Sequence, residues 1–405
     1  MIPYGRQAIS QADINAVVEV LRSDFLTQGP TAPRFEVAVA GYCGAKYAVA
    51  VNSATAALHI ACLALDVGPG DWVWTSPTTF VASANCVLYC GARVDFVDID
   101  PRTYNMSVER LREKLVGAQR AGTLPKVVIP VHLCGQSCDM AGIYALSRKY
   151  GFRIIEDASH AIGGKYRVVT GSGNGTSGGM REFSALEPIG NCCYSDITVF
   201  SFHPVKIITT GEGGMALTND SILANRLQRH RSHGISSNRA EMCARPADEI
   251  WNYQQIRLGF NYRMTDMQAA LGLSQMVRLD EFVEKRQHIA ARYNAALAGL
   301  PVIRPWQHLD TYSSYHLYPI RVRHSECHKT QRQVYDALWS SGVAVNIHYI
   351  PVYRQPYYEA MGFSAGYCPE AEQYYKETIS LPIFPELQVD QFNMVVDALR
   401  VALAG

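Results

Sequence analysis

The sequence has no excess of charge of one sign and no long apolar run. Its 37 Lys and Arg residues against 36 Asp and Glu residues give a formal net charge of +1, without a basic tail or a block of like charges. This balance argues against a nucleic-acid partner. The longest apolar stretch, from about Ala54 to Val67, is interrupted by His59 and Asp66, so it is too short and too polar to span a bilayer. We therefore expect neither a nucleic-acid nor a membrane partner.

An export signal and a metal-binding cysteine pattern are also missing. Residues 1–6 lack the charged and then apolar build of a signal peptide, so we expect a cytoplasmic protein. Cys134 and Cys138 are spaced C-x₃-C and Cys192 precedes Cys193, but no second pair follows at zinc-ribbon spacing. An odd count of 11 cysteines is typical of free, mostly buried thiols. We expect no metal site.

What the chain does contain is a regular alternation of short apolar runs and helical patterns. With 405 residues, 48% hydrophobic and 18% charged, it has the composition of a globular enzyme with one large and one smaller domain. Most runs are apolar throughout, as expected for strands covered on both faces of a mostly parallel sheet. The predicted strands are Tyr47–Val51, Trp72–Thr75, Val94–Val97, Val127–Val131, Arg153–Glu156, Thr198–Phe202 and Gly214–Leu217.

The pattern changes beyond Met264. A long helical segment, roughly Thr265–Leu297, precedes a mixture of strand and helix patterns, and we interpret it as a hinge helix. The sequence thus predicts a large domain over residues 1–255 and a smaller α+β domain over 256–405. Within the latter we expect strands at Tyr315–Val322 and Val343–Ile347 and helices at Thr330–Ser340 and Val389–Leu403.

Lys206 stands just beyond a predicted buried strand, in the segment Phe200–Lys206, and the small residues of Thr209–Gly214 follow. Ligands of open α/β sheets gather outside the carboxyl ends of the strands. Partial desolvation there would lower the pKa of the lysine amine, as a Schiff-base nucleophile requires. Taken alone, the segment also fits a strand that ends in an ordinary solvated lysine.

Three further strand ends carry complementary groups. Asp157 supplies a carboxylate, and Phe80 supplies a flat ring. Ser53, Ala54 and Thr55 begin a helix, where unpaired backbone N–H groups and the helix dipole favour a phosphate. An amine, a carboxylate, a ring and a phosphate cradle together suit pyridoxal 5′-phosphate (PLP).

Four separated motifs resemble the sugar-nucleotide aminotransferases of fold-type I, usually called the DegT/DnrJ/StrS family, over essentially the whole chain. These motifs are Asn52–Thr55, Glu156–Ala161, Phe200–Lys206 and Gly259–Met264. The resemblance implies an α/β fold of the fold-type I PLP-dependent transferases, with a mostly parallel seven-stranded sheet in the large domain.

The same resemblance implies roles for single residues. Lys206 would form the internal aldimine and then carry the proton, and Asp157 would face the pyridine nitrogen. Phe80 would stack on the ring, with His160 near its other face, and Asn261 would reach the phosphate of a partner subunit in a homodimer with shared sites. The cofactor's own phosphate would be held by Ser53, Ala54, Thr55 and Ser201. Phe80 and His160 also fit plain core residues, Asp157 a helix cap and Asn261 a turn.

Substrate contacts are expected near the N-terminus, at one strand end and in the smaller domain. The candidates are Tyr4, Leu26, Thr27, Gln28, Gly29, His132, His348 and Tyr349, and each also fits an ordinary loop residue. The segments Ile2–Gly5, Cys192–Asp196 and His348–Tyr353 resemble family members of pseudaminic acid biosynthesis. This implies transfer of an amino group from glutamate to C4 of a UDP-linked 2-acetamido-4-keto-6-deoxy hexose.

Three other functions stay open from the sequence. The same chemistry on another nucleotide sugar, such as GDP-perosamine or UDP-4-amino-arabinose synthesis, depends on loop residues that motifs do not resolve. A PLP-dependent sugar dehydratase is opposed by Lys206, because the dehydratases of the family carry histidine there. A PLP-sensing regulator is opposed by the lack of a DNA-binding segment.

A glycine-rich stretch, Gly171–Gly179, exceeds the usual family connection, and we expect a mobile surface loop. Gly173, Gly175 and Gly178 fit G-x-G-x-x-G, but no amphipathic helix opens before Pro188, so a dinucleotide site is not predicted.

Overall fold

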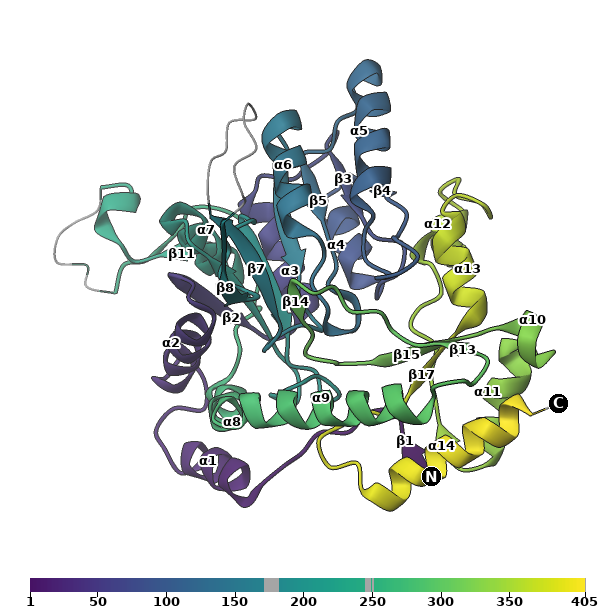
Figure 1. Ribbon diagram of the computed structural model, residues 1–405. Coiled ribbons are helices and arrows are strands. Elements are labelled where there is room, and N and C mark those ends of the chain that lie inside the picture. Colours follow the sequence, from purple (N-terminus) through teal and green to yellow (C-terminus); the bar gives the residue numbers. More distant parts are fainter. Residues whose placement is uncertain (171–181, 245–248, 250, 405) are drawn as a thin grey trace.

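The computed structural model describes residues 1–170, 182–244, 249 and 251–404. Its largest sheet has seven strands in the order β2-β10-β9-β6-β5-β3-β4 (Figure 1). Only β10 runs antiparallel to its neighbours in this sheet, so the prediction of a mostly parallel sheet is confirmed. The strands are β2 (Tyr47–Val51), β3 (Trp72–Thr75), β4 (Arg93–Phe96), β5 (Val127–Ile129), β6 (Arg153–Asp157), β9 (Ile197–Ser201) and β10 (Gly214–Thr218).

Helices cover both faces of this sheet, which explains why its strands are apolar throughout. Neighbouring residues on one strand enter different cores: Ile154 packs on one side and Ile155 on the other. The first side is covered by α2 (Thr31–Cys43), α5 (Val108–Ala121) and α6 (Met140–Tyr150). The second is covered by α3 (Ala54–Ala64), α4 (Ala82–Tyr89) and α7 (Ser221–Arg231).

The predicted long helix over Thr265–Leu297 is two helices, so this prediction is wrong. α8 (Asp266–Met276) ends before α9 (Leu279–Ala296) begins, and Arg278 between them leaves the helical conformation with φ −108° and ψ 10°. Its Nη2 donates to Oδ2 of the buried Asp13 on α1 (Gln11–Leu21) over 2.5 Å. The break is therefore fixed by a contact with the N-terminal helix.

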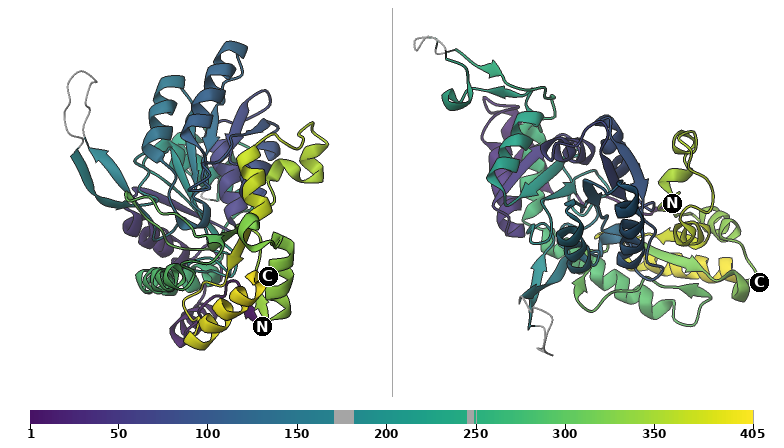
Figure 2. Two further views of the ribbon diagram at one scale, coloured as in Figure 1. Left: turned by 45° about the vertical axis from the view of Figure 1, so that its right-hand side comes forward. Right: turned by 90° about the horizontal axis from the view of Figure 1, so that it is seen from above.

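The C-terminal part, coloured green to yellow in Figure 2, contains a three-stranded sheet in the order β13-β15-β17, around which a separate core forms. Strand β1 (Ile2–Pro3) pairs with β16 (Val343–Ala344), and Ile2 packs into this same core. The division at residue 255 stays a prediction. Beyond α9 the chain contains β13 (Val302–Ile303), β15 (Tyr318–Val322), α10 (His324–Cys327), α11 (Gln331–Ser340), α12 (Pro356–Glu359), α13 (Pro369–Glu377), β17 (Thr378–Leu381) and α14 (Val389–Leu403). Of these, α12 and α13 pack instead into the core on the second face of the central sheet.

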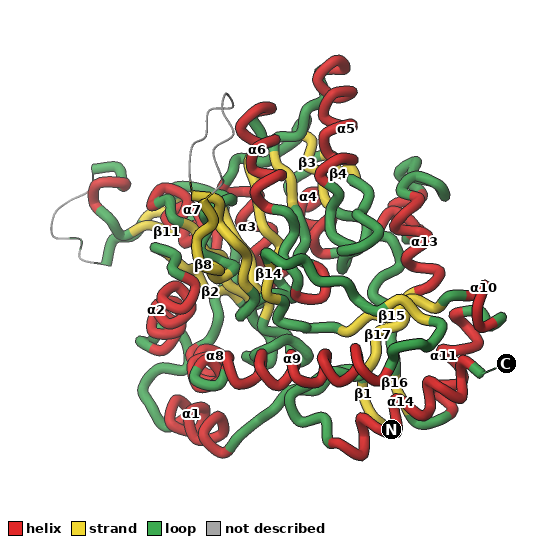
Figure 3. Tube along the Cα trace, viewed as in Figure 1, coloured by secondary structure: helices red, strands yellow, loops and turns green. Residues whose placement is uncertain are grey.

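Two small sheets were not predicted (Figure 3). One has the order β14-β7-β8, with β14 (Thr311–Tyr312), β7 (Lys165–Thr170) and β8 (Glu182–Pro188); the other pairs β11 (Ile235–Ser236) with β12 (Gln254–Gln255). The predicted loop at 171–179 lies outside the described residues. Single 3₁₀ turns are η1 (Leu133–Gly135), η2 (Arg239–Glu241) and η3 (Val352–Arg354). Among the helices of the described ranges, none has the length and apolarity needed to cross a membrane.

Candidate active site

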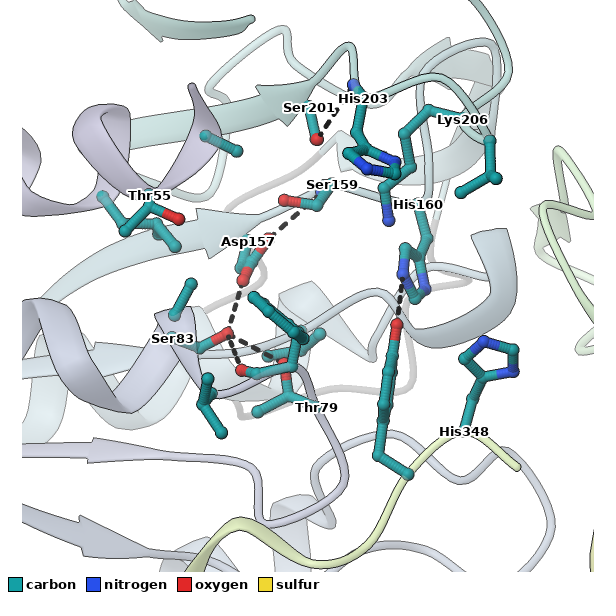
Figure 4. Close-up of a pocket in the computed structure, with 18 of the residues that line it drawn as sticks. Thr55, Thr79, Ser83, Asp157, Ser159, His160, Ser201, His203, Lys206 and His348 are labelled. Carbon is teal, nitrogen blue, oxygen red and sulfur yellow. Dashed lines mark hydrogen bonds between the residues drawn. The ribbon is translucent and has the colours of Figure 1, made fainter. Parts of the chain in front are cut away.

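A cavity of about 630 Å³ opens beyond the carboxyl ends of β6 and β9 (Figure 4). Most of the residues predicted to hold the cofactor line it, together with three of the predicted substrate contacts. The predicted residues in its wall are Tyr4, Ser53, Ala54, Thr55, Phe80, Asp157, His160, Ser201, Lys206, His348 and Tyr349.

Lys206 follows β9, and its amine points into the cavity (Figure 4). Burial lowers the pKa of this amine from 10.5 to about 8, although the negative charge of Asp157 acts in the opposite direction. Desolvation is the larger effect because water no longer stabilises the ammonium form. Near neutral pH, a far larger fraction of Lys206 is therefore in the neutral, nucleophilic amine form than of a surface lysine.

Asp157 is held in one orientation by hydrogen bonds to both carboxylate oxygens. The Ser83 hydroxyl on α4 donates to Oδ2 over 2.6 Å, and the Ser159 backbone N–H donates to Oδ1 over 3.1 Å. Ser83 in turn lies 2.8 Å from the Thr79 hydroxyl. Only 4% of Asp157 is exposed, and no cation in the described part of the chain lies at ion-pair distance from it. A protonated ring nitrogen would supply the missing positive partner.

The start of α3 forms the opposite end of the cavity. Ser53 caps this helix, because its Oγ accepts the Ala56 N–H over 3.1 Å, and the next backbone N–H groups begin the helix. Strand β10 approaches so closely that a Cβ at Gly214 would lie 2.6 Å from the Ala54 nitrogen. Ser201 and Thr55 add hydroxyls to this wall. A helix N-terminus with hydroxyls is a phosphate-binding arrangement.

Phe80, His160 and Tyr349 form a slot for a flat ring in the same cavity. Phe80 is 58% exposed although it is a large apolar side chain, and its ring centroid is 6.4 Å from that of Tyr349. His160 Nδ1 accepts the Cys134 N–H over 3.2 Å, so this hydrogen bond assigns the proton of the neutral ring to Nε2. Nε2 lies 3.2 Å from the Tyr349 hydroxyl and donates to it. Burial, and secondly the charge of Lys206, lower the pKa of His160 well below its usual value, which keeps the imidazole neutral.

Tyr4 and His348 face each other beside the slot, with ring centroids 5.2 Å apart. Figure 4 shows His348 on the opposite side of the cavity from Thr55. His348 Nδ1 lies 2.8 Å from the Ser380 hydroxyl. Burial and the nearby Lys206 charge lower the pKa of His348 to about 3. This wall therefore offers neutral hydrogen-bonding groups to a ligand.

His132 is placed elsewhere and does not reach the cavity. It has no exposed surface, and its Nε2 lies 2.8 Å from Glu156 Oε2 while its Nδ1 accepts the Cys138 N–H over 3.1 Å. Its expected position at the border of the cavity is thus not found. The reason is that side chains alternate along β6: Asp157 points into the cavity, and Glu156 points to the other face, where His132 lies.

The other sequence candidates also lie outside the cavity of a single chain. Leu26, Thr27 and Gln28 are exposed, and the Gly29 N–H donates to Asp266 Oδ2 over 2.5 Å at the start of α8. Asn261 is exposed and does not line the cavity. The cavity of one chain is thus formed without these residues.

Several cavity residues were missed from the sequence. Ser83 and Ser159 orient Asp157, as described above. The sequence feature that could have identified Ser83 is its position three residues after Phe80, at the start of the helix that places Ser83 beside β6. The other missed lining residues with polar side chains are Thr79, His203, Glu212, Asn346 and Gln355. Groups of three or more possible metal ligands are absent from the residues that the structure describes.

Comparison with known families matches residues 7–400 to the DegT/DnrJ/EryC1/StrS aminotransferases. The chain belongs to this family. It is 36% identical to the spore coat polysaccharide biosynthesis protein SpsC of Bacillus subtilis, over 100% of this chain and 97% of that protein. It is 34% identical to a UDP-4-amino-4,6-dideoxy-N-acetyl-β-L-altrosamine transaminase of Campylobacter jejuni, over 98% and 96%.

Among solved structures, the chain resembles Helicobacter pylori PseC, an aminotransferase involved in the biosynthesis of pseudoaminic acid. The TM-score is 0.86, with 28% identity and coverage of 99% of both chains. The chain is thus a sugar aminotransferase with the α/β fold of the PLP-dependent aminotransferases, and the family binds PLP. The cavity fits this cofactor, since it joins a buried amine, an unpaired carboxylate, a helix N-terminus and an exposed ring. When bound, PLP supplies the electron sink for carbanion chemistry at the amine-bearing carbon.

Proposed function

We propose that this enzyme transfers an amino group from glutamate to C4 of a UDP-linked 2-acetamido-4-keto-6-deoxy hexose, in pseudaminic acid biosynthesis. The observation that carries the proposal is full-length similarity to altrosamine transaminases, at 34% and 33% identity. The likeness to PseC along 99% of the chain supports it. Within the fold, amination rather than dehydration is favoured by a lysine at position 206.

The cavity residues support the chemistry of this proposal. Lys206, whose amine has a pKa of about 8, would move a proton between the amine-bearing carbon of the substrate and the cofactor carbon that holds the amine. Asp157, fixed by Ser83 and Ser159, keeps the cofactor's ring nitrogen protonated. Ser53, Ala54, Thr55 and Ser201 bind the cofactor's phosphate, and Phe80 and His160 enclose its ring.

The sugar would lie against Tyr4, His348 and Tyr349. These three side chains stay neutral, because burial raises the pKa of both tyrosines and lowers that of His348. Neutral donors and acceptors suit the hydroxyl, keto and acetamido groups of a hexose. We do not include His132 among the proposed substrate contacts, because its side chain is fully buried beside Glu156.

A second candidate substrate has its own support. The 36% identity to a spore coat polysaccharide protein slightly exceeds that to the altrosamine transaminases. The same amination on another nucleotide-linked 4-keto sugar is therefore the alternative. The site residues described above would serve both substrates, and the difference would lie in the sugar's ring substituents.

We extend the proposal to a homodimer with shared active sites. Large apolar side chains are exposed in the ten residues before Asn261 and next to the 26–29 segment, among them Trp251 (74%), Leu258 (74%) and Phe25 (52%). Burying such side chains against a second copy would be favourable. Asn261 and Leu26, Thr27, Gln28 and Gly29 would then face the partner's cavity rather than their own.

The test is a half-reaction followed by absorbance. The PLP-loaded enzyme is converted by glutamate to the amine form of the cofactor, separated from glutamate, and mixed with single nucleotide 4-keto sugars. Recovery of the original cofactor spectrum with the UDP-2-acetamido-4-keto hexose is expected. Recovery with a GDP-linked or an arabinose-type keto sugar instead would contradict the proposed substrate but keep the reaction. No spectral change with glutamate would contradict the donor.

A further inference from the structure

A second cavity, of about 810 Å³, shares no lining residue with the active-site cavity. Its lining residues come from β13, β15, the end of α9 and the loop after β4, elements that are located in Figure 1. Its volume is within the range of small-molecule sites. The residues that line it are Pro101, Arg102, Tyr104, Asn294, Val302, Ile303, Arg304, Pro305, Trp306, Gln307, Tyr315, Arg321 and Arg323.

The charge of this lining has one sign. It includes four arginines and no carboxylate. Arg321 forms an ion pair with Glu377, and Arg323 forms one with Glu326. Neither glutamate lines the cavity. Arg102 and Arg304 have no carboxylate at ion-pair distance anywhere in the ranges that the structure covers. Arg304 Nη1 donates to the backbone carbonyl of Asn294. The Arg102 guanidinium and the other N–H groups of Arg304 remain for an anion, and their planar donors match phosphate oxygens.

Aromatic rings form the second feature of the cavity. The Arg102 guanidinium carbon lies 4.0 Å from the ring centroid of Trp306. Tyr104 and Tyr315 have left-handed backbone conformations, with φ of 65° and 45°. Large side chains rarely adopt this region, and such strain is concentrated where function requires a fixed geometry. Both tyrosines line the cavity.

The third feature is an unsatisfied amide. Gln307 lines the cavity, and its Oε1 is buried without a hydrogen-bond partner among the described residues. Buried polar atoms are nearly always satisfied in folded proteins. The oxygen and nitrogen of a glutamine side chain are told apart by their contacts. The unpaired Oε1 of Gln307 could accept a hydrogen bond from a hydroxyl or an N–H group of a ligand.

We propose that this second cavity binds a nucleoside diphosphate group. Inorganic phosphate would use the arginines alone, and a free sugar would use Gln307 alone. A nucleoside diphosphate uses all three features: its phosphates bind Arg102 and Arg304, its flat base lies on the face of Trp306 that Arg102 does not cover, and a hydroxyl or base N–H reaches Gln307. The cavity is separate from the proposed substrate site, so one chain would hold two nucleotide-binding positions.

The experiment is calorimetric titration of the PLP-loaded enzyme with UDP, GDP, ADP and inorganic pyrophosphate, each alone. The test variant is Arg102→Ala/Arg304→Ala. The matched control is Arg110→Ala/Arg332→Ala, which removes the same charge from two exposed arginines on α5 and α11. For at least one nucleotide, the test variant should lose one binding event per chain or bind at least about tenfold more weakly, and the control should match wild type.

A third variant separates the base from the phosphates. Trp306→Ala should weaken nucleotide binding and leave pyrophosphate binding unchanged. Equal isotherms for wild type and Arg102→Ala/Arg304→Ala, with the thermal midpoint retained, would overturn the proposal. Equal loss of pyrophosphate and nucleotide binding in Trp306→Ala would overturn its nucleoside part.

The outcome is independent of the substrate proposed above. Arg102 and Arg304 are outside the active-site cavity, so their double variant should keep the half-reactions with glutamate and keto sugar. An enzyme that aminates no keto sugar but shows arginine-dependent nucleotide binding would refute only the proposed function. An enzyme that aminates the sugar but lacks this binding would refute only the second site.

Discussion

Burial and charge act in opposite directions on Lys206. Its pKa is lowered to about 8 by desolvation, while the Asp157 carboxylate raises it. Asp157 accepts hydrogen bonds from two neutral groups, Ser83 and Ser159. Neither group carries a positive charge that would compensate the carboxylate. In the cofactor-free enzyme, the lysine amine is thus mostly neutral above about pH 8. The Asp157 carboxylate keeps this pKa from falling further.

This balance predicts the effect of Asp157→Asn. In the cofactor-free enzyme, the rate at which trinitrobenzenesulfonate modifies Lys206 should rise with pH through a midpoint of about 8. Removing the Asp157 charge should move the midpoint to lower pH, because the ammonium form loses the negative charge that stabilises it. Mass spectrometry of the Lys206 peptide gives the rate, and Asp336→Asn on α11 is the control. A midpoint near 10.5 in wild type would refute the burial argument.

Lys206→Ala should abolish the covalent bond between enzyme and cofactor. Borohydride treatment of PLP-loaded wild type should leave the cofactor on the Lys206 peptide, and the variant should show none. Turnover should fall by at least about 10²–10⁴, the usual contribution of a positioned acid–base group. Lys149→Ala, at an exposed position near the end of α6, should keep both properties. A cofactor trapped on another lysine in wild type would contradict the assignment.

At the scale of elements, two helices offer a matched comparison. Ser53 caps α3 at the cavity, and Ser107 caps α5 away from it, each accepting the N–H three residues ahead. Ser53→Ala and Ser107→Ala should each lower the free energy of unfolding of the cofactor-free protein by ~1 kcal/mol. Only Ser53→Ala should also weaken PLP binding, because only the start of α3 is proposed to hold its phosphate. Denaturant titration and PLP titration separate the two effects, and equal PLP affinity in both variants would remove Ser53 from the phosphate site.

The elements of the central sheet were predictable because each strand is buried on both faces. The strands predicted at Tyr47–Val51 and Trp72–Thr75 begin and end at the same residues as β2 and β3. The break between α8 and α9 was not predictable, since Arg278 leaves the helix to reach Asp13, far away in the sequence. Local helical periodicity contains no information on such a contact.

The site was predictable where a motif ends a strand, and less so where side-chain direction decides. Asp157 is the last residue of β6 and Lys206 follows β9, and the carboxyl ends of these neighbouring parallel strands meet at one edge of the sheet, so both residues reach the cavity. His132 also follows a strand, but it pairs with Glu156 on the other face of the sheet. Ser83 comes from a helix on a different part of the chain, and its bond to Asp157 depends on the packing of α4.

At the scale of the whole molecule, one chain contains most but not all of the predicted site. Lys206, Asp157 and the start of α3 meet in one cavity, whereas Asn261 and the 26–29 segment are exposed outside it. Asn261 lies beside α3, within 3.5 Å of the Asn52 amide through its carbonyl oxygen. A homodimer with exchanged contacts would bring these residues to the cavity of the partner.

Subunit complementation tests this arrangement. Lys206→Ala and Asn261→Ala homodimers should each have low activity, for different reasons. When the two are mixed and allowed to exchange subunits, half of the dimers are mixed. In a shared-site dimer, one site of each mixed dimer combines an intact Lys206 with an intact Asn261 from the other chain. About a quarter of wild-type activity should therefore return. If each chain completed its own site, every chain would still contain one substitution and no activity would return, whatever the dimer's stability.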